Sequence, residues 1–222
     1  MWEPTVESVM TKDIVTAHES TGFKELVTLM TEHQISGLPV VDHNGRPVGV
    51  VTESDTLAKE EFDGGNTRKP LLSRERRAHW HKASGLHATE LMTSPAITVL
   101  DSSSITVAAR MLAEHKVRRL CVVNLAGNLV GVISRRDIIS TYLRDDKQIL
   151  ADIREHVFRK GMWLFPETLT ADVEAGEVTL EGEVRNRTTA QVAAQLTQKV
   201  PGVVGVHNKI RFEIDDTVTA PL

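Results

Sequence analysis

The chain has 222 residues, of which 41% are hydrophobic and 25% charged; these values are ordinary for a globular protein and allow two or three small domains. Its formal net charge of -4 provides no general attraction to nucleic acid or anionic membranes. No run approaches 18 apolar residues, the N-terminus has no secretory pattern, and the single cysteine, Cys121, excludes an intrachain disulfide framework. We therefore expect a cytoplasmic protein.

An internal repeat organises the first two thirds of the sequence. Residues 9–57 align without a gap with residues 91–139, 82 positions later. Identical pairs include Met10/Met92, Thr11/Thr93, Leu38/Leu120, Val40/Val122, Gly45/Gly127, Gly49/Gly131, Val50/Val132 and Asp55/Asp137. Two copies indicate a paired architecture rather than a long array.

The first half of each copy predicts a short strand followed by a helix. In the first copy, Ile14–Thr16 is a brief extended segment, and apolar residues at helical spacing between Phe23 and Met30 follow. Ser20 and Thr21 are candidates for the helix cap. In the second copy the strand is Ile97–Val99 and the helix runs from Ser103 or Ser104 to His115.

The second half of each copy predicts a β-hairpin followed by a helix. Leu38–Val41 and Arg46–Val51 are short apolar runs, and Asn44-Gly45 between them readily adopts a positive φ. Thr52–Asp55 then has the side chains of a helix start. Because the second copy repeats each step, the expected order in both is β-α-β-β-α.

The linker Lys59–Thr89 changes from acidic to basic residues after Gly64-Gly65. We expect one short helix in it, within Leu71–Lys82.

Each closing helix begins with a hydroxyl residue three positions before an aspartate, Thr52-x-x-Asp55 and Ser134-x-x-Asp137. A helix N-terminus presents unpaired N–H groups and partial positive charge, which accommodate an anion. A carboxylate fixed there can accept hydrogen bonds from the hydroxyls of a ribose. For a single such motif helix capping is the better explanation, but two in register favour a binding site.

These residues give a resemblance to a known family. Residues 9–57 and 91–139 resemble a tandem pair of CBS (cystathionine β-synthase) domains, or Bateman module, through the Met-Thr leads, Ser36–Asp42 and both glycine–hydroxyl–aspartate motifs. The resemblance implies an α+β fold with two β-α-β-β-α repeats related by a pseudo-twofold axis and two clefts between them. Family clefts bind AMP, ADP, ATP or S-adenosylmethionine, and the pairs commonly form homodimers.

The resemblance also implies which residues bind the ligand. The cleft at Asp137 would use Ser134 and Asp137 on ribose, Arg118, Arg119 and Arg136 on phosphate, and Thr11, Val15, Ile35 and Ser36 around the base. The cleft at Asp55 would use Thr52, Ser54 and Asp55, surrounded by Ser36, Thr93, Ile97, Val117 and Arg118.

The two clefts differ in charge. Arg118 and Arg119 replace Ser36 and Gly37, and two further arginines replace Glu53 and Ser54. Because a guanidinium matches the geometry of a phosphate, we expect a phosphorylated nucleotide to prefer the Asp137 cleft. A solvated basic surface is the alternative explanation for these arginines.

The last third has a different pattern. An apolar helix face from Ile149 to Phe158 precedes two alternating runs, a helix at Arg187–Val200 that Pro201-Gly202 ends, and a last strand up to Ile214. This α-β-β-α-β order and Val178–Val184 resemble a BON domain. That family is associated with phospholipid or macromolecular binding and has no known catalytic residues.

The expected organisation is CBS repeat 1 (1–62), basic linker (63–88), CBS repeat 2 (89–146), BON-like domain (147–215) and disordered tail (216–222). Since no catalytic constellation appears, we expect a regulatory protein without a catalytic cofactor or a metal, whose homodimer forms through the CBS repeats. The alternative is a structural protein with vestigial clefts whose BON-like domain binds phospholipid or protein. Binding of nucleic acid through Arg68–Lys82 is a third, disfavoured hypothesis.

Overall fold

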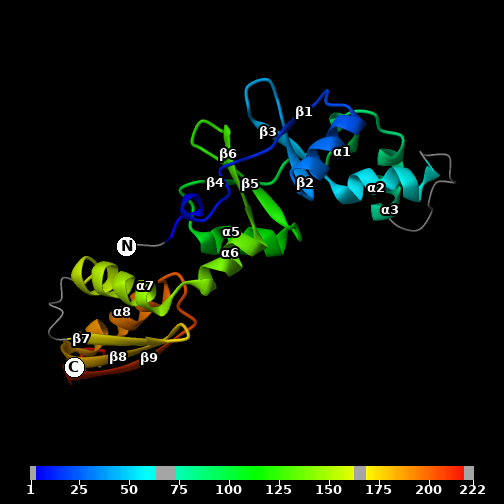
Figure 1. Cartoon of the computed structure of the whole chain (residues 1–222). Coiled ribbons are helices and arrows are strands. Elements are labelled where there is room, and N and C mark those ends of the chain that lie inside the picture. Colours follow the sequence, from blue (N-terminus) through cyan, green and yellow to red (C-terminus); the bar gives the residue numbers. More distant parts are fainter. Residues whose placement is uncertain (1–3, 64–73, 163–168, 218–222) are drawn as a thin grey trace, which may run out of the picture. The chain divides into compact units, whose positions relative to one another are not determined.

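The computed structural model describes residues 4–63, 74–162 and 169–217, and the chain divides into two compact units (Figure 1). One unit is Met10–Ser134, and the other combines Met1–Val9 with Arg135–Leu222. The first unit therefore contains both copies of the repeat except the last helix of the second copy.

Both copies have the predicted order β-α-β-β-α. The first copy consists of β1 (Ala17–His18), α1 (Phe23–Glu32), β2 (Gly37–Val41), β3 (Pro47–Thr52) and α2 (Glu53–Glu61). The second consists of β4 (Thr98–Leu100), α5 (Ile105–Glu114), β5 (Arg119–Val123), β6 (Leu129–Ser134) and α6 (Arg135–Ser140). The linker contributes α3 (Arg74–Ala83) and α4 (Ala88–Leu91).

The two sheets are built identically. Each has three strands, ordered β1-β2-β3 and β4-β5-β6, with a parallel first pair and an antiparallel hairpin. Val40 pairs with Gly49 in one sheet and Val122 with Gly131 in the other, and both ladders shift register at the next residue. The hairpin turn uses Gly45 at φ 77°, which confirms the predicted turn.

The starts of the first strand and helix differ from the prediction. The strand is Ala17–His18 rather than Ile14–Thr16, and Gly22 is the residue preceding α1. The Thr21 hydroxyl accepts a hydrogen bond from the His18 N–H at 2.9 Å, so it closes the preceding turn instead of capping the helix. In the second copy Ser104 caps α5 as expected, accepting from the Val107 N–H.

Each copy begins with a lead segment, which contains Met10-Thr11 in the first copy and Met92-Thr93 in the second. Each lead segment pairs with the hairpin of the other copy. Thr11 and Val132 exchange two backbone hydrogen bonds at 3.0 Å, and Thr93 and Val50 exchange two at 2.9 and 3.1 Å. These pairs are equivalent under the 82-residue offset, so the two copies are connected by a symmetric exchange of their leads.

Glycines make this exchange possible. A Cβ on Gly49 would lie 2.4 Å from Sδ of Met92, and a Cβ on Gly131 would lie 2.5 Å from Sδ of Met10. The methionine preceding each paired threonine therefore lies flat against a glycine of the other copy. The identities Met10/Met92 and Gly49/Gly131 thus reflect one packing contact that occurs twice.

The second unit contains the BON-like domain in the predicted order. The domain consists of α7 (Asp146–Asp152), the π-helical turn η4 (Ile153–Arg159), β7 (Leu169–Glu174), β8 (Glu177–Asn186), α8 (Arg187–Gln198) and β9 (Gly205–Ile214). The same unit also contains the short helices η1 (Val6–Ser8) and η3 (Thr141–Leu143). The sheet order is β7-β8-β9, with an antiparallel and a parallel pair.

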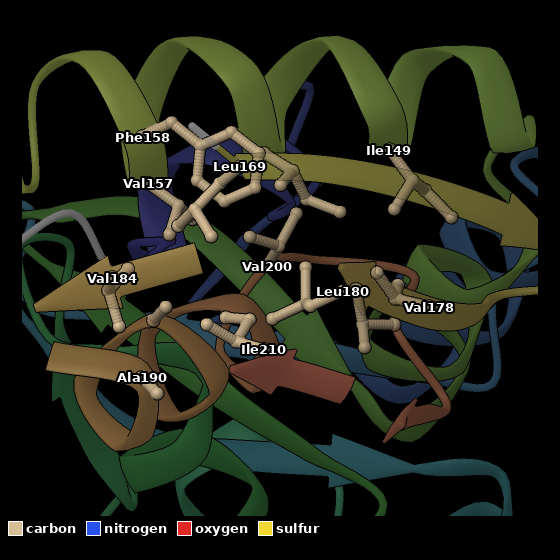
Figure 2. Close-up of a cluster of buried hydrophobic side chains, with 13 residues drawn as sticks. Ile149, Val157, Phe158, Leu169, Val178, Leu180, Val184, Ala190, Val200 and Ile210 are labelled. Carbon is tan, nitrogen blue, oxygen red and sulfur yellow. The ribbon is translucent and has the colours of Figure 1, made fainter. Parts of the chain in front are cut away.

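Alternation along the strands separates a core from a charged face. Val178, Leu180 and Val184 pack against the helical residues Ile149 and Phe158, as Figure 2 shows. Three exposed glutamates of β8 contact β9: Glu177 lies within hydrogen-bonding distance of His207, and Glu181 and Glu183 form ion pairs with Lys209 and Arg211. The domain therefore has one apolar layer and one open face of mixed charge.

The two aspartates at the end of the described chain contact the start of α8. Asp215 binds the Arg187 guanidinium, and Asp216, the first residue of the predicted tail, accepts hydrogen bonds from Thr188. The rest of the predicted tail, residues 218–222, lies outside the described residues.

Candidate ligand-binding site

A cavity of about 380 Å³ lies within the unit Met10–Ser134, between the β3–α2 junction, the second lead and the approach to β5. Its lining is Ser36, Val50, Thr52, Glu53, Ser54, Thr93, Pro95, Ala96, Ile97, Val117, Arg118 and Arg119. It therefore combines side chains of both copies, and it lies beside Asp55.

Most residues predicted for the Asp55 cleft lie around this cavity. The lining includes seven of them: Ser36, Thr52, Ser54, Thr93, Ile97, Val117 and Arg118. Arg119, which the sequence analysis assigned to the other cleft, also lines this cavity. Four lining residues were missed: Val50, Glu53, Pro95 and Ala96. Thr93 and Ile97 were both predicted to lie at this cleft. Pro95 and Ala96 lie between them in the chain, so the continuity of the segment could have indicated these two residues.

Asp55, the eighth residue predicted for this cleft, is buried next to the lining residues Thr52, Glu53 and Ser54 but is not itself among the lining residues. Its Oδ2 accepts hydrogen bonds from the Thr52 N–H at 2.8 Å and the Thr52 hydroxyl at 2.7 Å. This arrangement satisfies the free backbone donor at the start of α2, as the capping interpretation predicted. Capping and a place beside the cavity therefore coexist in the same residue.

The other oxygen of Asp55 binds a residue that the sequence analysis missed. Lys82 Nζ lies 2.6 Å from Asp55 Oδ1 and 2.9 Å from Thr93 Oγ1. Lys82 is in α3, outside both copies, so neither the repeat nor the family resemblance pointed to it.

Arg119 crosses from the second copy to the first. Its guanidinium donates to the Gly37 carbonyl oxygen at 2.8 Å and to the Ser36 hydroxyl at 2.6 Å. A Cβ on Gly37 would lie 3.2 Å from the Val51 carbonyl oxygen and at an ordinary contact distance of 3.5 Å from Arg119 Cζ, so the tightest neighbour at this position is the strand backbone. Gly37 and Arg119 are equivalent positions, and their difference makes the cavity asymmetric.

The remaining predicted residues lie elsewhere. Thr11 pairs with β6, and Val15 and Ile35 pack on the core of the first copy. Ser134 is the last residue of β6 and pairs with Arg119 in the strand register. Arg136 and Asp137 lie in the first turn of α6, in the other compact unit, so the Asp137 cleft stays a prediction.

The described ranges give no sign of two other kinds of site. They contain no group of three or more histidine, cysteine or acidic side chains arranged for a metal ion. Within the same ranges, no helix has the length and apolar character required to cross a bilayer.

The duplicated fold and its shared cavity define the class of protein. Residues 6–59 and 88–144 match the CBS domain family, and residues 145–213 match the BON domain family. The chain therefore belongs to the CBS-domain proteins and carries a C-terminal BON domain, as the sequence motifs predicted.

Known relatives resemble the CBS part. The CBS domain-containing proteins CBSX2 and CBSX1 of Arabidopsis thaliana, both chloroplastic, are 33% and 31% identical over 56% and 63% of this chain. The matches cover 57% and 64% of those two proteins, so the chain spans less than two thirds of their length. A crystal structure of CBSX2 in complex with AMP covers 63% of this chain and 96% of its own, with 33% identity and a TM-score of 0.54.

Proposed function

We propose that the CBS pair binds an adenine nucleotide in the cavity beside Asp55 and regulates other proteins without catalysing a reaction. The main support is the cavity, which combines hydroxyl, apolar and guanidinium groups from both copies. Its relative CBSX2 has been crystallised with AMP.

The cavity lining suits the three parts of a nucleotide. A volume of about 380 Å³ falls in the range of small-molecule sites, roughly 300–1,000 Å³. The apolar side chains of Val50, Ile97 and Val117 are suited to a base. The hydroxyls of Ser36 and Ser54 can hydrogen-bond ribose or phosphate oxygens, and Arg118 supplies a guanidinium for the phosphate.

Calorimetry with AMP, ADP, ATP and S-adenosylmethionine tests the proposal. The protein must first be shown by mass spectrometry to carry no co-purified ligand and by circular dichroism to be folded. We expect saturable binding of at least one of the four. Heat of dilution alone in all four titrations would refute the proposal.

The Asp137 cleft is a second proposed site. Ser134, Arg136 and Asp137 would be its contacts, and the guanidinium of Arg136 favours a phosphorylated ligand. A stoichiometry of two ligands per chain, reduced to one by Asp137→Ala, would support it. A stoichiometry of one that Asp137→Ala leaves unchanged would exclude it.

We propose a homodimer formed through the CBS repeats. Val27 on α1, Leu57 on α2 and Val107 on α5 are large apolar side chains that remain exposed in the single chain. Association of two chains would remove such groups from water. Sedimentation velocity should give twice the mass of 24.5 kDa, and Leu57→Asp should shift the protein toward the monomer.

The BON domain is proposed as the module that contacts a partner. Acidic residues outnumber basic ones between Asp145 and Asp216, and Lys209 and Arg211 of β9 are paired with glutamates of β8. Because anionic lipid surfaces attract unpaired cations, this charge pattern favours a protein partner over a phospholipid. Flotation with anionic liposomes tests the lipid alternative, and retention of the chain by the liposomes would support it.

A further inference from the structure

The linker helix α3 supplies a cation to the carboxylate on which a ribose would be held. Lys82 Nζ lies 2.6 Å from Asp55 Oδ1, and the two side chains are 14% and 5% exposed. The same ammonium group donates to the Thr93 hydroxyl, which lines the cavity, at 2.9 Å. The contact is therefore a largely buried ion pair between the linker and the cavity wall.

The position of Lys82 is fixed by packing. The next residue, Ala83, is fully buried against Ala58 and Phe62 of the α2 region. Lys59 of α2 also donates to the Ala83 carbonyl oxygen at 3.2 Å. In Figure 1, α3 accordingly lies beside α2, the helix whose first turn contains Asp55. Lys82 is thus held next to Asp55 by a neighbouring helix rather than by a chance encounter of two surface side chains.

The hydrogen bonds that Asp55 already accepts leave too few acceptor positions on its carboxylate for a ribose. Oδ2 already accepts from the Thr52 backbone and hydroxyl, and Oδ1 accepts from Lys82. A ribose diol bound by this carboxylate donates two further hydrogen bonds, so it would have to replace the lysine at Oδ1. Lys82 and a ribose therefore make alternative contacts with one oxygen atom.

We propose that Lys82 is an internal competitor of the ligand at the Asp55 cleft. This inference rests on the proposed function, since it concerns an adenosyl ligand in the same cavity. The lysine satisfies the buried carboxylate of the ligand-free protein, and it leaves when a ribose binds. Its departure releases the α3 side chain from both Asp55 and Thr93. Ligand binding in the cleft is thereby transmitted to the linker between the two repeats.

A pair of lysine variants tests the competition. Lys82→Met retains most of the aliphatic side chain and removes the charge, so AMP should bind roughly threefold to tenfold more tightly than to the unaltered chain. Lys59→Met is the matched control, because Lys59 contacts the same helix without touching Asp55. Its affinity for AMP should stay within about twofold of the unaltered value. An unchanged affinity of Lys82→Met for AMP refutes the proposal. A weaker affinity also refutes it, because Lys82 would then contribute to AMP binding instead of competing with it.

Chemical labelling of lysines provides a second test, which does not depend on how the Lys82 variant folds. Acetylation of Lys82, followed by mass spectrometry, should be slow in the ligand-free chain and faster in Asp55→Asn, which loses the ion pair. AMP should accelerate labelling of Lys82 in the unaltered chain. Protection of Lys82 by AMP, or equal labelling in Asp55→Asn, contradicts the proposal.

The two tests separate failure of this inference from failure of the proposed function. If the unaltered chain binds AMP and Lys82→Met gains no affinity, only the competitor role fails. If neither chain binds any of the four adenosyl ligands, the proposed function fails and the competitor role fails with it.

Discussion

The two CBS copies have the same backbone arrangement but differ in side chains that line the cavity between them. Strand order, register shift and turn glycine are repeated at an offset of 82 residues. In contrast, Gly37 in the first copy corresponds to Arg119 in the second, and the two residues are in contact. Two arginines at these positions would bring like charges together, whereas glycine and arginine fit. The comparison shows that positions maintaining the pairing are duplicated, whereas Arg118 and Arg119 in the cavity wall differ from their equivalents Ser36 and Gly37.

The largest expected effect concerns the duplicated contact between glycine and methionine. Gly131→Ala should destabilise the protein by about 1–3 kcal/mol, because its Cβ would meet Met10 and also the Thr11 carbonyl oxygen at 3.0 Å. Gly49→Ala should cost less, since the three nearest atoms to its Cβ belong to the flexible side chain of Met92. Urea unfolding monitored by circular dichroism measures both.

A double-mutant cycle sharpens this comparison. Met92→Ala removes the side chain that obstructs the Cβ in Gly49→Ala, so the pair should show a large compensating coupling. Met10→Ala should compensate less for Gly131→Ala, because the Thr11 backbone remains. Equal coupling in the two copies would mean that the leads are anchored identically, contrary to the geometry.

A position that differs between the copies can be tested by giving the second copy the residue of the first. Arg118→Ser places the residue of the first copy in the second, and it should weaken AMP binding by roughly tenfold or more, because a charge-assisted hydrogen bond is lost. Adenosine, which has no phosphate, should bind both proteins about equally. A parallel loss of adenosine affinity would mean that Arg118 supports the cavity wall rather than the phosphate.

The two aspartates provide a smaller contrast. Asp137→Ala should weaken nucleotide binding more than Asp55→Ala, because Asp55 is already bound by Lys82, whereas Arg135 and Arg136 replace Glu53 and Ser54 at the start of the helix that contains Asp137. Calorimetric titration of both variants with AMP decides it. Equal losses would remove the proposed difference between the clefts.

The sequence was sufficient where a pattern had a physical period or a duplicate. Helical spacing, the Asn44-Gly45 turn and the helix start at Thr52 each predicted an observed element. The short helices η1 and α4 were missed because a single turn has no period to detect. Lys82 was missed for a different reason. Its role depends on the packing of α3 against α2, and nothing in the composition of the linker specifies that contact.

The smallest expected effect concerns another difference between the copies, Cys121 in β5 in place of Pro39 in β2. Burial raises the pKa of the Cys121 thiol to about 11, above its ordinary value of 9.0. The unfolded chain therefore releases this proton at lower pH than the folded one, so stability falls as the pH rises from about 9 to about 11 and is unaffected below that window. The free energy of unfolding should fall by about 1 kcal/mol at pH 10.

Cys121→Val, which cannot ionise, should lack this part of the alkaline decline in stability. The difference between the two urea-unfolding profiles therefore isolates the thiol from other titrating groups. Superimposable profiles from pH 8 to pH 11 would show that the thiol is solvated in the folded protein, contrary to its burial in the strand.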